Sequence, residues 1–121
     1  MKFLLPQGRG QQAESLACEY LQAQGLTLLE KNFSCRLGEL DLIMQADDTL
    51  VFVEVKFRKN ADYGHGSEAV DRYKQRKLVR AAQYYLQQHP HLQDTPMRFD
   101  VVSIEGPMQR IQWLANAFPA E

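Results

Sequence analysis

Apolar residues recur every three to four positions near the start of the chain, which is the spacing of one face of an α-helix. The residues on this face are Ala13, Leu16, Ala17, Tyr20 and Leu21. Gly25 follows them, and glycine commonly ends a helix because it adopts the left-handed backbone conformation without penalty. The pattern predicts a helix over residues 10–24.

Three strand-like segments come next. Residues 26–33 read LTLLEKNF, residues 39–44 read ELDLIM, and residues 50–57 read LVFVEVKF, a run rich in β-branched and aromatic side chains. Alternation along ELDLIM predicts two faces, with Leu40, Leu42 and Met44 on one and Glu39, Asp41 and Ile43 on the other. Only a short polar turn separates the second segment from the third. We therefore expect these two strands to form an antiparallel hairpin.

A second helical pattern begins after the polar, glycine-rich stretch RKNADYGHG. Ser67 is a plausible N-cap, with Glu68 and Asp71 in the first turn, so we expect a helix from Ser67 to about Gln88. The segments MRFDVVSIE and RIQWLANAF then read as two further strands. A strand–helix–strand connection normally joins parallel neighbours, whereas the hairpin before it is antiparallel.

The expected fold is therefore α/β, in the order α-β-β-β-α-β-β. It comprises a mixed five-stranded sheet flanked by helices in one domain over residues 1–121.

Apolar residues make up 45% of the chain and charged residues 24%, values that exclude a disordered or fibrous protein. No apolar run approaches the ~20 residues of a membrane span, and no secretory leader is recognisable. We expect a cytoplasmic protein with no membrane partner.

Positive charge is concentrated in one part of the chain, although the net charge is only −1. Residues 1–53 carry four basic and seven acidic side chains, whereas residues 54–80 carry eight basic and four acidic ones. A local basic patch is typical of phosphate binding. The alternative is a solvated helix face, and charge alone does not separate the two.

Two charged residues interrupt the apolar strand at residues 50–57. Glu54 and Lys56 share one face with Phe52, because residues two apart point the same way. Asp41 on the preceding strand can come within ~5–8 Å of Glu54 across the hairpin. Two adjacent carboxylates repel unless a proton or a cation lies between them, and Mg²⁺ is commonly held by one or two carboxylates plus substrate phosphate.

These residues supply the parts of a phosphodiesterase site. The backbone carbonyl of Val55 can provide a further oxygen ligand, and Lys56 can position a water or stabilise developing negative charge. Glu14, on the flank of the apolar stripe of the first helix, is the candidate fourth member of the site after Asp41, Glu54 and Lys56. The structural alternatives are a salt bridge between Glu54 and Lys56, an edge-strand charge at Asp41 and a solvent-facing Glu14.

The same residues carry a resemblance to a known family. The segment GELDLI, a short acidic turn and the segment VFVEVKFR resemble the bacterial YraN-type proteins, and the match extends to FDVV at residues 99–102. That family is similar to the PD-(D/E)xK nucleases, and within them to archaeal Holliday-junction resolvases. In this chain Leu40 precedes Asp41 where the superfamily name has proline.

The resemblance implies a restriction-endonuclease-like core with Mg²⁺ or Mn²⁺ at the site. It implies that Asp41 and Glu54 hold the metal, that Lys56 is catalytic and that Glu14 is the helix-borne carboxylate. The function expected is a metal-dependent DNA endonuclease acting on structured DNA in recombination or repair. If the substrate is a junction, two cuts are needed, and a homodimer is the natural assembly.

A surface for the substrate is also expected. If the basic segment contacts nucleic acid, the expected contact residues are Arg58, Lys74, Gln75 and Lys77. The competing hypothesis is a nucleic-acid-binding or scaffolding module that keeps the fold but has little or no activity of its own. The low net charge argues against tight, autonomous DNA binding, whereas the complete set of three acids and one lysine favours an enzyme over that module.

Overall fold

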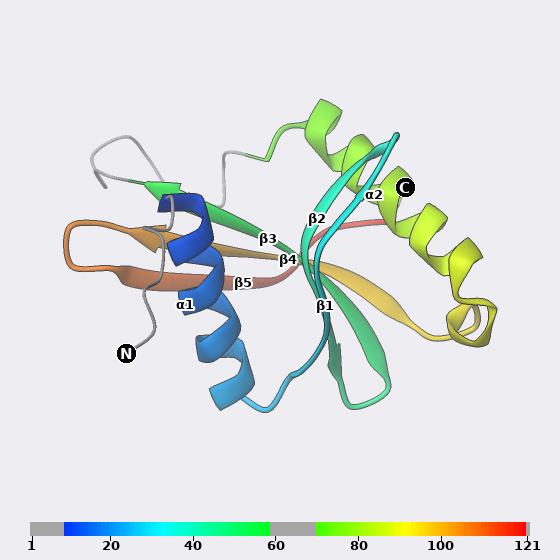
Figure 1. Ribbon diagram of the computed structural model, residues 1–121, viewed down its shortest axis with the longest axis horizontal. Coiled ribbons are helices and arrows are strands. Elements are labelled where there is room, and N and C mark those ends of the chain that lie inside the picture. The colour runs from blue at the N-terminus through cyan, green and yellow to red at the C-terminus, as the bar shows by residue number, and fades with distance from the viewer. Residues whose placement is uncertain (1–8, 59–69, 121) are drawn as a thin grey trace, which may run out of the picture.

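The computed structural model describes residues 9–58 and 70–120, and these form an α/β fold around one sheet (Figure 1). The element order α-β-β-β-α-β-β matches the order predicted from the sequence, and it is consistent with a restriction-endonuclease-like core. Neither described α-helix is long and apolar enough to cross a membrane. The elements are α1 (Arg9–Ala23), β1 (Thr27–Cys35), β2 (Gly38–Ala46), β3 (Thr49–Arg58), α2 (Arg72–Gln88), the 3-10 turn η3 (Pro90–Leu92), β4 (Met97–Glu105) and β5 (Arg110–Phe118).

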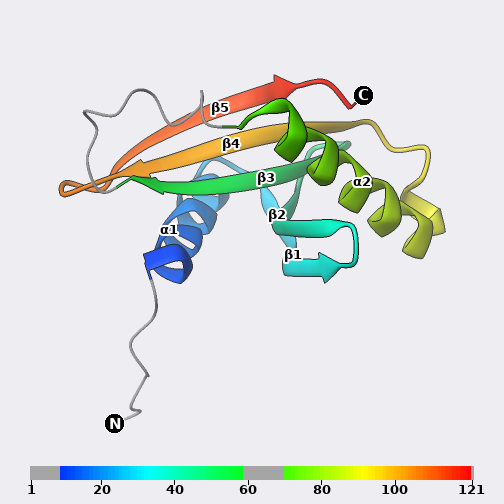
Figure 2. The same ribbon diagram turned by 90° about the horizontal axis from the view of Figure 1, so that it is seen from above.

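The five strands lie in the order in which they occur along the chain, from β1 to β5. Figure 2 shows β5, β4 and β3 side by side, with β2 and β1 beyond β3. The pairs β1–β2, β2–β3 and β4–β5 are antiparallel, whereas β3 and β4 are parallel and joined through α2. The sheet is therefore mixed, as predicted, because a parallel pair needs a crossover long enough to hold a helix.

Each face of the sheet has its own core. On one face, Ala13, Ala17 and Leu21 of α1 pack with alternate valines of β3. On the other face, Leu78, Ala82 and other apolar residues of α2 pack with Phe52. Because successive side chains of a strand point to opposite faces, β3 supplies both cores. The predicted division of β3, with Phe52 on one side and Val51 and Val53 on the other, is confirmed.

The predicted alternation along β2 holds only in part. Ile43 faces the core under α2, while Leu42 and Met44 face the core under α1. Leu40, which was expected beside Leu42, instead belongs to the core under α2. The alternation breaks between Leu42 and Leu40, where the pairing of β2 with β3 ends at Leu42, opposite Val53.

The second helix starts later than predicted. Val70 and Asp71 precede it, and the backbone of Asp71 is extended (φ −75°, ψ 172°). The Asp71 side chain accepts a hydrogen bond from the backbone N–H of Lys74 at 2.8 Å, which makes Asp71 the N-cap. Asp71 takes the capping role assigned to Ser67, and Ser67 and Glu68 lie outside the described residues.

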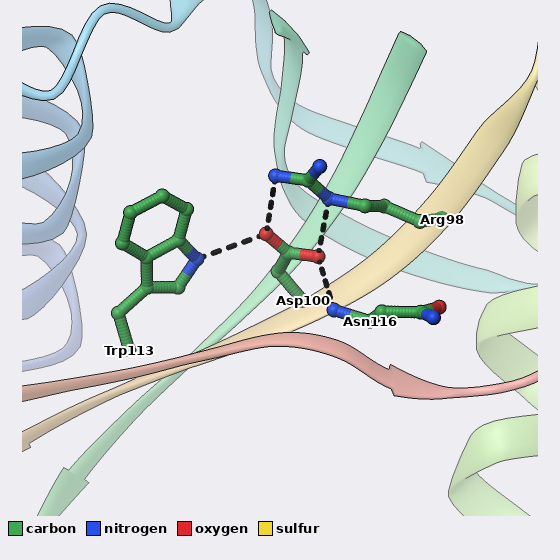
Figure 3. Close-up of polar contacts among 4 residues, drawn as sticks. All are labelled: Arg98, Asp100, Trp113 and Asn116. Carbon is green, nitrogen blue, oxygen red and sulfur yellow. Dashed lines mark hydrogen bonds and ion pairs between the residues drawn. The ribbon is translucent and has the colours of Figure 1, made fainter.

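A buried carboxylate joins β4 to the edge strand β5 (Figure 3). Asp100 is fully buried, and it accepts hydrogen bonds from the guanidinium of Arg98, the indole N–H of Trp113 and the backbone N–H of Asn116. The pairing of β4 with β5 is irregular at this point, between Phe99 and Val101. The side chain of Asp100 thus supplies the acceptor that a regular strand would offer Asn116.

Candidate active site

The site lies where β2 and β3 separate. Beyond the Leu42–Val53 pair the two strands are no longer hydrogen-bonded to each other, and the side chain of Asp41 fills the opening. Its Oδ2 accepts a hydrogen bond from the backbone N–H of Val55 at 2.8 Å. Since the N–H and C=O of one strand residue point to the same side, the carbonyl of Val55 faces the same opening.

Glu54 lies beside Asp41, with only 6% of its surface exposed. Burial, followed by repulsion from Glu54, raises the pKa of Asp41 from 3.8 to about 7, although the hydrogen bond from Val55 opposes this shift. The two carboxyl groups are therefore close enough to disfavour a second negative charge. Asp41 and Glu54 thus line the same cleft, and Asp41 is only partly exposed, unlike a solvated edge-strand charge.

Glu54 has a cationic partner, and it comes from α2. The ammonium group of Lys74 forms an ion pair with the carboxylate of Glu54. Burial acts to lower the pKa of Lys74, but the hydrogen bond and the charge of Glu54 outweigh burial, and the net shift is upward. Lys74 therefore neutralises the charge that Glu54 brings into the sheet.

Lys56 lies two residues beyond Glu54 on the same face of β3 and is half-buried. Its pKa is lowered, first by burial and then by the neighbouring charge of Lys74, while Glu54 and Asp41 oppose the shift. A lysine that loses its proton more easily than usual is better suited to exchange a proton with water. The salt bridge predicted as the alternative role of Glu54 is made with Lys74 of α2 and not with Lys56.

The first helix brings a further carboxylate to the same opening. Glu14 and Asp41 line one cleft of about 690 Å³, whose walls come from α1, β2, β3 and α2. The charge of Glu14 contributes to the raised pKa of Asp41. Glu14 is partly buried, in contrast to the solvent-facing alternative considered from the sequence.

The donor set suits a hard cation that keeps part of its hydration. Within residues 9–58 and 70–120, no three acidic, histidine or cysteine side chains lie close enough together to hold a metal by themselves. Asp41 and Glu54 provide two carboxylates, and Mg²⁺ is commonly bound by such a pair with water and substrate phosphate completing its shell. A cation would also relieve the repulsion that raises the pKa of Asp41.

The residues expected to contact nucleic acid occupy different environments. Lys77 is exposed at the rim of the cleft, and its ammonium group lies 5.4 Å from the centroid of the Tyr73 ring. The side-chain amide of Gln75 donates to the backbone carbonyl of Val70 and thus holds the first turn of α2. Arg58 is partly buried at the end of β3, and Lys74, which pairs with Glu54, is itself exposed.

Sequence comparisons identify the family of the chain. The Uncharacterised protein family UPF0102 matches residues 13–104. The chain belongs to the UPF0102 family. It is similar to a UPF0102 protein of Nitrosococcus oceani, at 46% identity over 100% of this chain and 99% of the relative. A UPF0102 protein of Stutzerimonas stutzeri is 50% identical over 93% of this chain and 95% of the relative.

Membership of the UPF0102 family bears out the YraN-type resemblance. The matched range of the family includes all four residues of the candidate site, Glu14, Asp41, Glu54 and Lys56. The names of the relatives assign no activity. Sequence reasoning missed the role of Lys74 as the counter-charge of Glu54, because the two residues are brought together only when α2 packs on the sheet.

Proposed function

We propose that this UPF0102 protein is a metal-dependent nuclease that hydrolyses phosphodiester bonds in DNA. The observation that carries the proposal is the convergence of Asp41 and Glu54, from different strands, in an open cleft. The half-buried Lys56 lines an adjoining hollow that Glu54 also lines. Structural ion pairs are normally arranged to neutralise charge, whereas here two carboxylates face each other at a cost to stability. Active sites commonly contain such costly pairs.

Each residue has a role in the proposed reaction. Asp41 and Glu54, with the carbonyl of Val55, would hold Mg²⁺ or Mn²⁺, which supplies Lewis-acid stabilisation of the phosphate when bound. Lys56 orients the attacking water and stabilises negative charge on the phosphate oxygens. Glu14 lines the cleft from α1, where it can accept a hydrogen bond from a water molecule.

Cleavage of a panel of DNA substrates tests this function. Wild-type protein is incubated with branched, flapped, duplex and single-stranded DNA in Mg²⁺ or Mn²⁺, alongside Glu54→Gln and Lys56→Ala. We expect both variants to lose nearly all cleavage, because each removes a group that contacts the metal or the reacting phosphate. Lys31→Ala, at an exposed position on β1, is the matched control and should cleave like the wild type. Equal cleavage by Glu54→Gln and the wild type would reject the site.

A binding or scaffolding module is the second candidate function. The ion pair between Glu54 and Lys74 favours it, because a carboxylate that is already neutralised binds a metal less readily. A module of this kind would bind DNA and cut nothing in the same panel. Calorimetric titration with Mn²⁺ separates the two functions, since a nuclease of this type must bind the metal and a scaffold need not.

We further propose structured DNA as the substrate, in the context of recombination or repair. If that substrate is a four-way junction, two strands must be cut symmetrically, and the active species would be a homodimer. Light scattering with and without junction DNA measures the assembly directly. A monomer that resolves junctions in two symmetric cuts would contradict the dimer.

A further inference from the structure

The outer surface of α2 carries tyrosines and basic residues on one stripe. At 100° per residue, four side chains fall within about 60° of one another around the helix axis. We call them the aromatic–basic stripe, and they are Tyr73, Lys77, Arg80 and Tyr84. All four are exposed, and Tyr73 is the most open of the tyrosines named, with 65% of its surface accessible.

The stripe begins at the candidate active site. Tyr73 and Lys77 line the same cleft as Asp41 and Glu54. At 1.5 Å per residue, the stripe then runs about 16 Å along the helix. Its far end, Tyr84, lines a second hollow of about 400 Å³ together with Arg36, in the turn between β1 and β2. The helix thus connects the cleft to a second basic position by a continuous line of exposed side chains.

Within the described part of the chain, the basic side chains of the stripe form no salt bridge. The helix α2 carries five basic residues and no acidic one. Lys74 pairs with Glu54, but neither Lys77 nor Arg80 forms a salt bridge with another described residue. Unpaired cations on a surface attract phosphate, and each contact made with phosphate adds to the salt dependence of binding.

The tyrosines of the stripe bear on which kind of nucleic acid this basic surface can bind. The ammonium group of Lys77 lies over the Tyr73 ring, which holds the ring in place. Tyr84 is similarly supported by Phe33, with ring centroids 6.2 Å apart. Aromatic rings interleaved with cations stack on the faces of unpaired bases, and these faces are inaccessible within a duplex.

We propose that the aromatic–basic stripe binds a single-stranded segment of nucleic acid and leads it into the cleft. Tyr73 would stack on a base next to the phosphate that reaches the proposed metal site of Asp41 and Glu54, while Lys77 and Arg80 would contact the backbone beyond it. The inference rests on the proposed nuclease function and narrows its substrate to DNA with unpaired nucleotides, such as a flap or an open branch. A fully paired duplex leaves the tyrosines unused.

Binding without cleavage tests the inference. Fluorescence anisotropy is measured with a labelled oligothymidine of about 12 nucleotides and with a duplex of equal length, in EDTA, on the Glu54→Gln background. We expect the single strand to bind more tightly than the duplex. We expect Tyr73→Ala to weaken single-strand binding by about 5- to 100-fold, the range for losing one stacked base. Tyr73→Phe keeps the ring and should bind like its parent.

Two further variants complete the measurement. Lys77→Ala should reduce the salt slope of single-strand binding by about 0.7, the contribution of one phosphate contact. Met108→Ala, at an exposed apolar position in the turn between β4 and β5, is the control and should leave binding unchanged. Equal affinity for both DNAs, or full binding by Tyr73→Ala, would overturn the inference.

The outcomes separate this inference from the nuclease itself. Binding is measured where no hydrolysis occurs, so it does not depend on the catalytic proposal. A tyrosine-dependent preference for single strands, in a wild-type protein that cuts nothing with Mn²⁺, would reject the nuclease and support the stripe. Cleavage of plain duplex with no preference for unpaired DNA would reject the stripe and support the nuclease.

Discussion

Replacing Asp41 with asparagine should stabilise the protein at neutral pH while removing one ligand of the proposed metal site. The asparagine amide oxygen can still accept the hydrogen bond from the backbone N–H of Val55, so the connection between β2 and β3 is kept. What is lost is the negative charge beside Glu54. The variant therefore isolates the electrostatic cost of the carboxylate pair from its structural role.

The magnitude follows from the pKa of Asp41, which burial and repulsion from Glu54 raise from 3.8 to about 7. The folded protein thus keeps a proton that the unfolded chain has released, so wild-type stability falls as the pH rises from about 4 to about 7 and then levels off. Of the interval from about pH 5 to pH 8, about two pH units lie below the pKa of Asp41. At 1.36 kcal/mol per unit, the free energy of unfolding should therefore fall by about 3 kcal/mol over this interval. Asp41→Asn removes this titration, so its stability advantage should grow by about that amount over the same range.

Urea unfolding in EDTA, followed by the fluorescence of the single tryptophan, Trp113, measures the free energy of unfolding at each pH. Asp94→Asn changes an exposed carboxylate to the same amide and is the matched control, with no growing advantage expected. Samples at about pH 8 are then freed of EDTA, and Mn²⁺ is added. At 100 times its dissociation constant it should stabilise the wild type by about 2.7 kcal/mol and leave Asp41→Asn almost unchanged.

Two results would refute the reasoning. If the wild type and Asp41→Asn lost stability in parallel from about pH 5 to pH 8, burial and repulsion from Glu54 would not raise the pKa of Asp41 in solution. If Mn²⁺ stabilised both proteins equally, Asp41 would not be a ligand of the metal. The first result tests the electrostatics of the folded chain, and the second tests metal binding by Asp41. Either result can therefore occur without the other.

Three other substitutions give separate predictions. Lys74→Met removes the counter-charge of Glu54 and should tighten Mn²⁺ binding in calorimetric titrations, and weaker binding would mean that Lys74 helps to form the site. Asp100→Asn leaves one of the donors around this buried carboxylate unsatisfied. It should lower the free energy of unfolding, measured in urea, by about 2–4 kcal/mol, while the affinity for Mn²⁺ should be retained. Glu14→Gln should slow cleavage more than Glu19→Gln, an exposed position on the same helix, and equal rates would remove Glu14 from the site.

Local pattern was enough to predict the elements and their order. The strands β4 and β5 were predicted with the bounds they have, because alternating and β-branched runs are read within the segment itself. The antiparallel hairpin and the parallel crossover followed from connection length. Errors arose where a contact outside the segment decided the conformation. The start of α2 is set by Asp71, and the alternation of β2 breaks at Asp41, where the strand leaves β3.

The candidate site divides in the same way between sequence and structure. Spacing along one strand determines that Glu54 and Lys56 share a face, because the side-chain period of a strand is two residues. Spacing does not determine the ion pair of Glu54 with Lys74, the cleft shared by Glu14 and Asp41, or the connection of Asp100 to β5. Those contacts join residues far apart in the chain, and only the packing of two helices and five strands brings their charges together.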